Sequence, residues 1–210
     1  ISGLTTLETL RRLMAAGLDS LPGAGAEILD PDVRRAISPA KPSVASWLAV
    51  MHEAHTLGLA TSATMMYGHV EQPRQRVDHL LAIRDLQARC PEGKPGFLAF
   101  IPWIFRSTGT RLEAEGISTD FSPLEYIRII AASRLILNNI PNIQASWLTV
   151  GRQTAQAALH SGANDMGSIM IEEHVVSSAG ADNRFDAEGI QQAIREAGFT
   201  PRLRNQLYEL

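Results

Sequence analysis

The sequence predicts an α/β fold in which short apolar strands alternate with helices and pair into a parallel sheet. Two observations lead to this prediction. A run of small and apolar residues about one strand long lies at 60–67, and the run at 97–105 is continuously apolar, as is typical of a strand covered on both faces. A helical pattern follows each run. We count about five strand–helix units, whereas a closed (β/α)8 barrel has eight. The pattern therefore predicts a small open sheet or the later part of a barrel.

The composition indicates one sizeable core. The chain has 210 residues, of which 45% are hydrophobic, and a formal net charge of −3, which is ordinary for a soluble domain. No charge run predicts a nucleic-acid or membrane-surface partner, and no apolar run reaches the roughly 18–20 residues of a membrane span. Cys90 is the only cysteine, which excludes an internal disulfide and fits a reducing cytoplasm. Because the sequence starts at Ile1 and not at methionine, we expect a processed, trimmed or partial chain.

The first third of the chain predicts three helices and a short strand. The helices are expected at 6–16, 32–37 and 43–57, and the strand begins near Leu18. The third helix has a buried stripe and ends at Gly58; its stripe consists of Val44, Trp47, Leu48, Met51 and Ala54. Between strand and second helix, Glu27 stands in a loop with two glycines. This loop is not a dinucleotide fingerprint, because the third glycine and a long following helix are missing.

The middle of the chain contains the two clearest strands. The strand 60–67 ends in Gly68-His69-Val70-Glu71, where glycine permits a sharp turn and two ionisable side chains follow. A helix over 72–89 comes next, with Val77, Leu80, Leu81 and Leu86 expected to face inward. The strand 97–105 leads into a polar loop over 106–121, where a barrel strand would deliver a catalytic loop.

The last part begins with a well-marked helix from Ser122 to about Asn138. Serine caps it, proline takes its first position and glutamate completes a capping box. Further elements are expected as a strand at 143–150, a helix at 152–161, a strand at 163–171, a loop at 177–183 and a helix at 186–197. We predict a partial barrel over 1–175 and a C-terminal loop and helix packed on it over 176–210.

Polar side chains follow the predicted strands. Because the carboxyl ends of parallel strands meet at one edge of a sheet, we expect these side chains to share one pocket. The candidates are Glu27, His69, Glu71, Trp103, Gln144, Ser146, Asn164 and Asp165. From the residues alone, the chain reads as a soluble α/β protein with a small-molecule face, without a phosphate loop or a nucleophile elbow.

Each candidate also has a purely structural interpretation. Glu27 could be an exposed loop carboxylate, and His69 with Glu71 could be a helix-capping pair on the surface, since their spacing is diagnostic of neither acid–base catalysis nor a metal site. Trp103 could belong to the core or could wall a pocket and stack on a planar ligand. Asn164-Asp165 could be turn chemistry or a clamp for a ligand hydroxyl.

Two further features favour a structural interpretation. Cys90 ends a predicted helix and is expected to be an inert thiol. The segment Glu172-Glu173-His174 lacks the HExxH zinc motif and is expected to be a solvated surface.

Several stretches together resemble one enzyme family. They are GAGAEIL (23–29), ATMMYGHVE (63–71), FIPW within 97–105, NIPNIQASW (139–147), GANDMGSIMIEE (162–173) and REAGFTPRLRNQLYEL (195–210). The chain resembles the C-terminal part of the radical S-adenosylmethionine (SAM) enzymes of the futalosine route to menaquinone and of the deazaflavin (FO) synthases. Trp103 and Ser146-Trp147 favour the branch that cyclises dehypoxanthine futalosine over the aminofutalosine synthases and FO synthases.

The resemblance implies a fold and cofactors. The fold is the C-terminal part, about strands 4–8, of a (β/α)8 TIM barrel of radical SAM type, with 24–27 and 63–71 ending strands four and five. The cofactors are S-adenosyl-L-methionine and a 4Fe-4S cluster held by a CxxxCxxC motif after strand one. The implied reaction transfers a ribose hydrogen of dehypoxanthine futalosine to a 5′-deoxyadenosyl radical, and the carbon radical then closes onto the aromatic ring.

The resemblance also implies residue roles. The implied catalytic residues are His69 and Glu71. The implied cofactor-binding residues are Glu27, Tyr67, Gly68 and His69. The implied substrate-binding residues are Trp103, Gln144, Ser146, Asn164 and Asp165.

The chain departs from the family pattern in one respect. It has no CxxxCxxC motif, and Cys90 lies alone between a helix and a strand, so we expect no metal ligands here and no catalysis by this chain alone. The expected partners are a nucleoside substrate and a missing N-terminal barrel portion, whose absence would leave sheet edges unpaired. Two alternatives stay open: a cluster-free barrel enzyme with His69 and Glu71 as acid and base, and a non-catalytic half-barrel that docks onto a separately encoded N-terminal half.

Overall fold

One parallel sheet organises the protein. The computed structural model describes residues 3–118, 122–169 and 185–210, and within them four strands pair in parallel in the order β1-β2-β3-β4. The strands are β1 (Ser20–Leu21), β2 (Ala60–Tyr67), β3 (Phe97–Ile104) and β4 (Asn142–Ile143). A parallel bridge between Gln144 and Asp165 extends this order by one more segment. Strands that neighbour each other in both sequence and sheet are typical of a (β/α) barrel.

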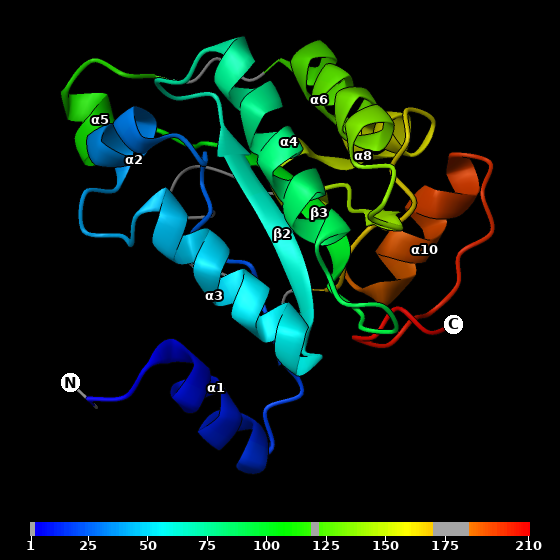
Figure 1. Ribbon diagram of the computed structural model, residues 1–210. Helices are drawn as coiled ribbons and strands as arrows, with labels where there is room; N and C mark the ends of the chain where they lie inside the picture. The colour runs from blue at the N-terminus through cyan, green and yellow to red at the C-terminus, as the bar shows by residue number, and fades with distance from the viewer. Residues whose placement is uncertain (1–2, 119–121, 170–184) are drawn as a thin grey trace.

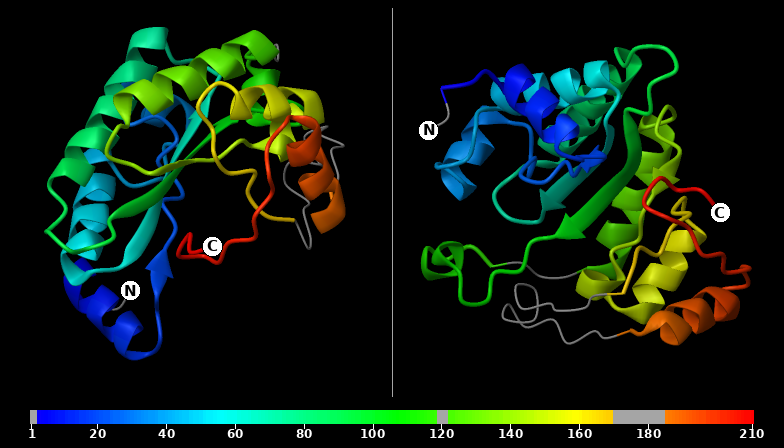
Figure 2. Two further views of the ribbon diagram at one scale, coloured as in Figure 1. Left: turned by 90° about the vertical axis from the view of Figure 1, so that its right-hand side faces the viewer. Right: turned by 90° about the horizontal axis from the view of Figure 1, so that it is seen from below.

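Helices connect the strands and cover one face of the sheet. They are α1 (Thr6–Ala15), α2 (Pro31–Ile37), α3 (Val44–Leu57), α4 (Pro73–Ala88), α5 (Arg111–Ala114), α6 (Pro123–Ile136), α7 (Trp147–Val150), α8 (Arg152–Leu159) and α10 (Ala187–Glu196). Figures 1 and 2 show α3, α4 and α6 side by side over the same face. The main hydrophobic core lies between these helices and the sheet.

The strand register separates two faces of the sheet. Tyr67 pairs with Ile104, and Met66 pairs with Trp103; partners in a parallel pair point to the same side, and successive residues alternate. Tyr67 and Ile104 are 1% and 5% exposed, whereas Met66 and Trp103 are half-buried. We define the covered face by Ala63, Met65, Tyr67, Phe100 and Ile104, and the open face by Ser62, Met66, Ile101 and Trp103.

Helix α3 illustrates how the covered face is built. The Ser43 hydroxyl caps its first turn, and Gly58 ends it in the left-handed conformation. From this helix, Trp47 stacks on Phe97 with ring centroids 6.3 Å apart, and His55 meets the same ring edge-on at 4.5 Å. Aromatic contacts from α3 therefore cover the start of β3.

The structure confirms an α/β fold with a parallel sheet, and it is compatible with a partial TIM barrel. The strand predicted at 60–67 forms over that range, and the strand predicted at 97–105 ends one residue earlier. The assignment to strands four to eight stays a prediction. Helix α10 packs against α8, where Gln156 Nε2 donates to the Ala193 carbonyl at 3.0 Å, and the predicted boundary at 175/176 lies outside the described residues.

Two strand predictions are wrong in extent. Of the region 143–150, only Ile143 lies in a strand, as the second residue of β4, and Trp147–Val150 is a helical turn, because an apolar run this short suits either structure. In the described part of 163–171, Asp165 alone pairs with another strand segment. The predicted loop at 106–121 contains the short helix α5. The predicted loop at 177–183 and the segment 172–174 lie outside the described residues.

The inward stripe of α4 is also partly wrong. Val77 is 42% exposed, while His79 and Ile83 are fully buried. The stripe passes instead through Arg76, which precedes Leu80 by one turn and forms ion pairs beneath the helix. A charged residue was not expected in a buried stripe, and this shifted the predicted face. In the described ranges, no helix is long and apolar enough to cross a membrane.

Candidate active site at the carboxyl edge of the sheet

The predicted site residues come together at one edge of the sheet. The Met66 amide donates to the Glu27 carbonyl at 3.0 Å, and Met66 is in register with Trp103. These three residues therefore form a row across neighbouring segments. On the other side of β3, the Gln144 amide donates to the Phe100 carbonyl at 3.0 Å, and Gln144 forms the bridge with Asp165.

The loop after β1 lies directly against β2. The Gly23 amide donates to Ser62 Oγ at 3.2 Å, and Thr64 Oγ1 donates to the Gly23 carbonyl at 2.9 Å. A Cβ atom at position 23 would lie 1.8 Å from the Ser62 carbonyl oxygen. Only glycine permits this approach, which brings the following residues to the carboxyl edge.

Glu27 is a buried carboxylate in a strained backbone position. It is 7% exposed and has a φ of 48°, a left-handed conformation that is uncommon for residues other than glycine. Its carboxylate pairs with Lys41. The Arg34 guanidinium fixes the preceding main chain by donating to the carbonyls of Gly25 and Ala26 at 2.8 and 2.6 Å. Glu27 is therefore not the exposed loop carboxylate of the structural interpretation.

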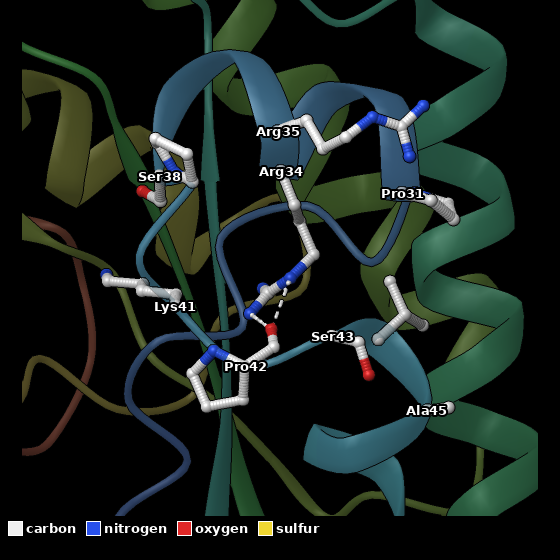
Figure 3. Close-up of a pocket in the computed structure, with 10 residues that line it drawn as sticks. Pro31, Arg34, Arg35, Ser38, Lys41, Pro42, Ser43 and Ala45 are labelled. Carbon is white, nitrogen blue, oxygen red and sulfur yellow. Dashed lines mark hydrogen bonds between the residues drawn. The ribbon is translucent and has the colours of Figure 1, made fainter.

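A cavity of about 340 Å³ adjoins Lys41, between α2 and the start of α3. Figure 3 shows the Arg34 guanidinium inside this region, bonded to the Pro42 carbonyl. The lining consists of Pro31, Arg34, Arg35, Ser38, Pro39, Lys41, Pro42, Ser43, Val44 and Ala45. Each cation in it has an internal partner: main-chain carbonyls for Arg34, Asp32 for Arg35 and Glu27 for Lys41.

Glu71 holds the turn after β2 together. Its carboxylate accepts from the amides of Gly68 at 2.6 Å and His69 at 2.9 Å and from Arg76 Nε at 2.7 Å. Burial raises the pKa of Glu71, but the adjoining His69 side chain and the hydrogen bonds from the two amides outweigh it and lower the pKa to about 2. Glu71 is therefore ionised at neutral pH.

His69 is enclosed by the same turn. Its Nδ1 lies 2.8 Å from Glu71 Oε2 and 2.8 Å from the Val70 amide, and its Nε2 lies 3.0 Å from the Met66 carbonyl. Phe105 packs against the ring at a centroid distance of 5.8 Å. The His69 and Glu71 side chains are both fully buried, so they are not a capping pair on the surface.

Arg76 is a site-supporting residue that sequence reasoning missed. It pairs with Glu71 and with Glu125 of α6, and its guanidinium lies 5.0 Å from the centroid of the Tyr67 ring. The partner Glu125 lies 49 residues away in sequence, so no local spacing signals the ion pair. Because the Tyr67 ring is on the covered face, a ligand at the open face could reach only its main chain.

The predicted substrate-side residues differ in how far their side chains are exposed to a ligand. Trp103 is half-buried on the open face, whereas Trp147 is 3% exposed and packs against Phe185. Ser146 is buried, and its amide donates to the Tyr126 hydroxyl at 2.7 Å.

Asn164 and Asp165 are both bonded within the chain. The Asn164 Oδ1 atom accepts from the Ile143 amide at 2.9 Å and from Arg134 Nη2 at 2.8 Å. Asp165 pairs with Arg204, at 2.7 Å between Oδ2 and Nη2. The bond to Arg204 spans 39 residues, and sequence reasoning did not find it.

Cys90 does not fit a cluster ligand at this edge. It follows α4 and precedes β3, which places it at the amino edge of the sheet, and its Sγ lies 3.7 Å from the Lys94 carbonyl. Burial raises the pKa of this thiol, which disfavours the thiolate that binds metal. Within the described residues, no group of three or more His, Cys, Asp or Glu side chains is arranged to hold a metal ion.

Comparisons with known proteins agree with the motifs. Residues 94–210 match the family described as CofH/MqnC C-terminal region. The chain is 46% identical over 209 residues to the cyclic dehypoxanthine futalosine synthase of Streptomyces coelicolor, covering 100% of this chain and 51% of that protein. It is 40% identical over 210 residues to the synthase of the same name from Halalkalibacterium halodurans, covering 100% of this chain and 55% of that protein.

A second enzyme is similarly related. The chain is 40% identical over 213 residues to the 5-amino-6-(D-ribitylamino)uracil--L-tyrosine 4-hydroxyphenyl transferase of Methanopyrus kandleri, covering 100% of this chain and 57% of that protein. The chain spans about half the length of the curated relatives it matches. The family match includes more than half of this chain and reaches its last residue. The protein therefore belongs to the CofH/MqnC family of enzymes, of which it carries the C-terminal region.

Proposed function

We propose that this chain is the later part of a radical SAM (β/α)8 barrel that cyclises dehypoxanthine futalosine in menaquinone biosynthesis. The observation that carries this choice is the 46% identity, along the whole chain, to a cyclic dehypoxanthine futalosine synthase. The parallel sheet supports it, because barrels of this kind bind ligands at the carboxyl edge of their strands.

The proposal includes S-adenosyl-L-methionine and a 4Fe-4S cluster as cofactors. The cluster would be held outside these 210 residues, since Cys90 lies at the opposite edge of the sheet and has no second cysteine beside it. The contribution of this chain is then to bind and orient nucleosides and to exclude water from the reaction.

Glu27 suits a ribose. A buried carboxylate accepts hydrogen bonds from both hydroxyls of a ribose diol, and the left-handed backbone of Glu27 is a strain that typically marks a functional position. In this proposal the diol replaces Lys41 as a partner of the carboxylate.

The turn after β2 would flank the same nucleoside. Gly68 and His69 are candidates for contact, with Glu71 as the group that fixes them, because the Glu71 carboxylate binds the amides of both residues. Tyr67 would contribute its main chain. A catalytic proton transfer by His69 or Glu71 requires one of these internal bonds to open.

Trp103 and Gln144 would form the substrate side. Trp103 offers an aromatic surface on the open face, which suits stacking on the aromatic ring of the substrate, and Gln144 offers an amide one strand away. We propose that Ser146 and Asn164 act by holding the main chain around them, since both are bonded within the chain.

Further strands would close the barrel over the open face. The half-buried side chains of this face and the greater length of the curated relatives support a preceding barrel portion as partner, joined to this chain or encoded separately. Closure would also pair the edge strand β1, which is otherwise available for non-native pairing.

A second candidate function is the hydroxyphenyl transferase reaction. The observation that favours it is the 40% identity to the Methanopyrus kandleri enzyme over the whole chain. This identity is lower than that to the Streptomyces coelicolor synthase, so we place it second. Aminofutalosine synthase and FO synthase activities are the remaining alternatives within the same chemistry.

One experiment separates these functions. The full-length gene product is reconstituted anaerobically with iron and sulfide, its cluster is verified by electron paramagnetic resonance after reduction, and it receives S-adenosylmethionine with either dehypoxanthine futalosine or the aminouracil–tyrosine pair. We expect 5′-deoxyadenosine and a cyclised nucleoside with the first substrate only. Product from the second pair alone, or cluster-loaded protein inactive on the first, would refute the proposal.

A further inference from the structure

The last residues of the chain form a tight turn around Asn205. The Asn205 Oδ1 atom accepts from the amides of Leu207 at 2.8 Å and Glu209 at 3.1 Å, and its Nδ2 donates to Glu209 Oε2 at 2.7 Å. Tyr208 takes a φ of 64° within this turn. The turn brings Arg204 and Tyr208 to the same side, where the guanidinium lies 3.8 Å from the centroid of the tyrosine ring.

Both side chains meet the carboxylate of Asp165. Arg204 donates from Nε to Oδ1 at 3.1 Å and from Nη2 to Oδ2 at 2.7 Å, and the Tyr208 hydroxyl donates to Oδ2 at 3.1 Å. The Asp165 side chain is 9% exposed and the Arg204 side chain 18%. A two-pronged, largely buried pair fixes position and orientation together, unlike an exposed ion pair.

Asp165 connects the C-terminal turn to the sheet. Its main chain bridges Gln144, and its carbonyl accepts from the Ala145 amide at 2.8 Å. Its Oδ1 atom also accepts from the Gly167 amide at 3.1 Å. Gly167 in turn lies against the Gln144 side chain, since a Cβ atom at 167 would be 2.7 Å from Gln144 Nε2. The C-terminal turn therefore acts on residues at the predicted substrate side.

Polar contacts, not apolar burial, attach this segment. The leucines of the turn remain largely exposed, at 93% for Leu203, 49% for Leu207 and 80% for Leu210. Figure 2 shows the segment leaving α10 and running beside the sheet. Since these leucines bury little apolar surface, the Asp165 contacts are a main attachment of the turn.

Backbone strain marks the same turn. Among the described residues, Glu27 and Tyr208 are the non-glycine residues with positive φ. Such conformations persist where surrounding contacts impose them, and they cluster at functional sites. Glu27 lies beside β2, on the proposed cofactor side. Tyr208 contacts Asp165, which lies beyond β4 at the other end of the strand order.

We propose that Arg204 and Tyr208 are positioning residues: they hold the Asp165 carboxylate and thereby set Gln144 and Gly167 on the substrate side of the site. The C-terminal turn then positions residues of the active site without touching the reacting atoms. This inference rests on the proposed function for the identity of the substrate, and on the contacts above for the positioning.

The test uses the full-length, cluster-loaded gene product with Arg204→Met, Arg204→Lys and Tyr208→Phe. Arg202→Met is the matched control, because Arg202 is exposed and lies two residues away. The first readout is hydrogen exchange at the Gly167 amide. We expect the exchange rate to rise about tenfold in Arg204→Met, a change that corresponds to the loss of about one charge-assisted hydrogen bond. The rise should be smaller in Arg204→Lys, and Arg202→Met should leave the rate unchanged.

The second readout separates positioning from stability. We expect KM for dehypoxanthine futalosine to rise about tenfold in Arg204→Met, with KM for S-adenosylmethionine unchanged, and with partial recovery in Arg204→Lys. Unchanged exchange at Gly167, or quickened exchange with an unchanged substrate KM, would overturn the inference. If Arg204→Met does not fold, Tyr208→Phe decides by the same criteria, since it removes one hydroxyl. If the KM effect appears instead with the aminouracil–tyrosine pair, the positioning stands and the proposed function fails.

Discussion

The two faces of the sheet differ in how completely other parts of this chain cover them. Neighbouring residues of β2 show the difference most directly: Met65 is fully buried under the helices, and Met66 is half-buried on the open face. Local packing by α3, α4 and α6 accounts for the covered face. Of the predicted site residues, Trp103 lies on the open face, and we propose that ligands and other parts of the barrel supply the remaining contacts of this face.

The largest expected effect compares these two methionines. Met65→Ala should lower the free energy of unfolding by about 2–5 kcal/mol, because it leaves a cavity in a packed core. Met66→Ala should cost under about 1 kcal/mol in this chain, because solvent can fill the space. Urea denaturation of both variants provides the measurement. Equal losses would contradict the distinction between the faces.

The ion pairs beneath α4 provide the second comparison. Arg76→Met removes the cationic arginine partner of a fully buried Glu71 carboxylate, and we expect a loss of about 3 kcal/mol in the free energy of unfolding. Arg74→Met is the matched control, because Arg74 is 88% exposed and lies 3.5 Å from Asp78; its cost should stay below about 0.5 kcal/mol. A loss in Arg76→Met as small as that of the control would show that Arg76 does not hold the turn.

These ion pairs also show what sequence can and cannot predict. The strand 60–67 is predictable because a run of small and apolar residues lies between Gly58 and Gly68, which end the preceding helix and the strand itself. The pairing of Arg76 with Glu125 is not, because tertiary packing alone brings them together.

The candidate site was predictable in the same limited way. Strand-end positions identified Glu27 and Trp103, since parallel topology fixes which edge they share. The burial of the Glu27 carboxylate depends on Lys41, and the environment of Asp165 depends on Arg204. Neither partner has a sequence signature, so the chemistry of the site required the structure.

The third comparison concerns the stability of the fold as the pH is lowered. We expect the change in the free energy of unfolding to be small near neutral pH. His55 and His79 are buried on the covered side, and burial lowers their pKa values to about 4 and about 3. An unfolded histidine has a pKa of about 6.5, so between these values the unfolded chain binds more protons. Stability is therefore fully present above about pH 6.5 and falls as the pH decreases toward the folded-state values, by up to about 1.4 kcal/mol per pH unit for each histidine.

Urea unfolding at several pH values between 7 and 4.5 checks this expectation. Glu71 should contribute little in that range, because its folded-state pKa is about 2 and its stabilisation is lost only below the unfolded value of about 4.3. A flat stability between pH 6.5 and 4.5 would mean that the folded and unfolded chains bind protons equally at these histidines, and it would contradict the lowered pKa values.

The most direct test of the central claim, that ligands bind at the open face, uses the methyl signals of the same two methionines. The full-length protein is labelled with 13C-methyl methionine, assigned with Met65→Leu and Met66→Leu, and titrated with S-adenosylmethionine and dehypoxanthine futalosine. We expect the Met66 methyl resonance to shift and the Met65 resonance to stay in place. A shift of the Met65 resonance alone would contradict the account. Saturation of the protein with both ligands without a shift of the Met66 resonance would contradict it as well.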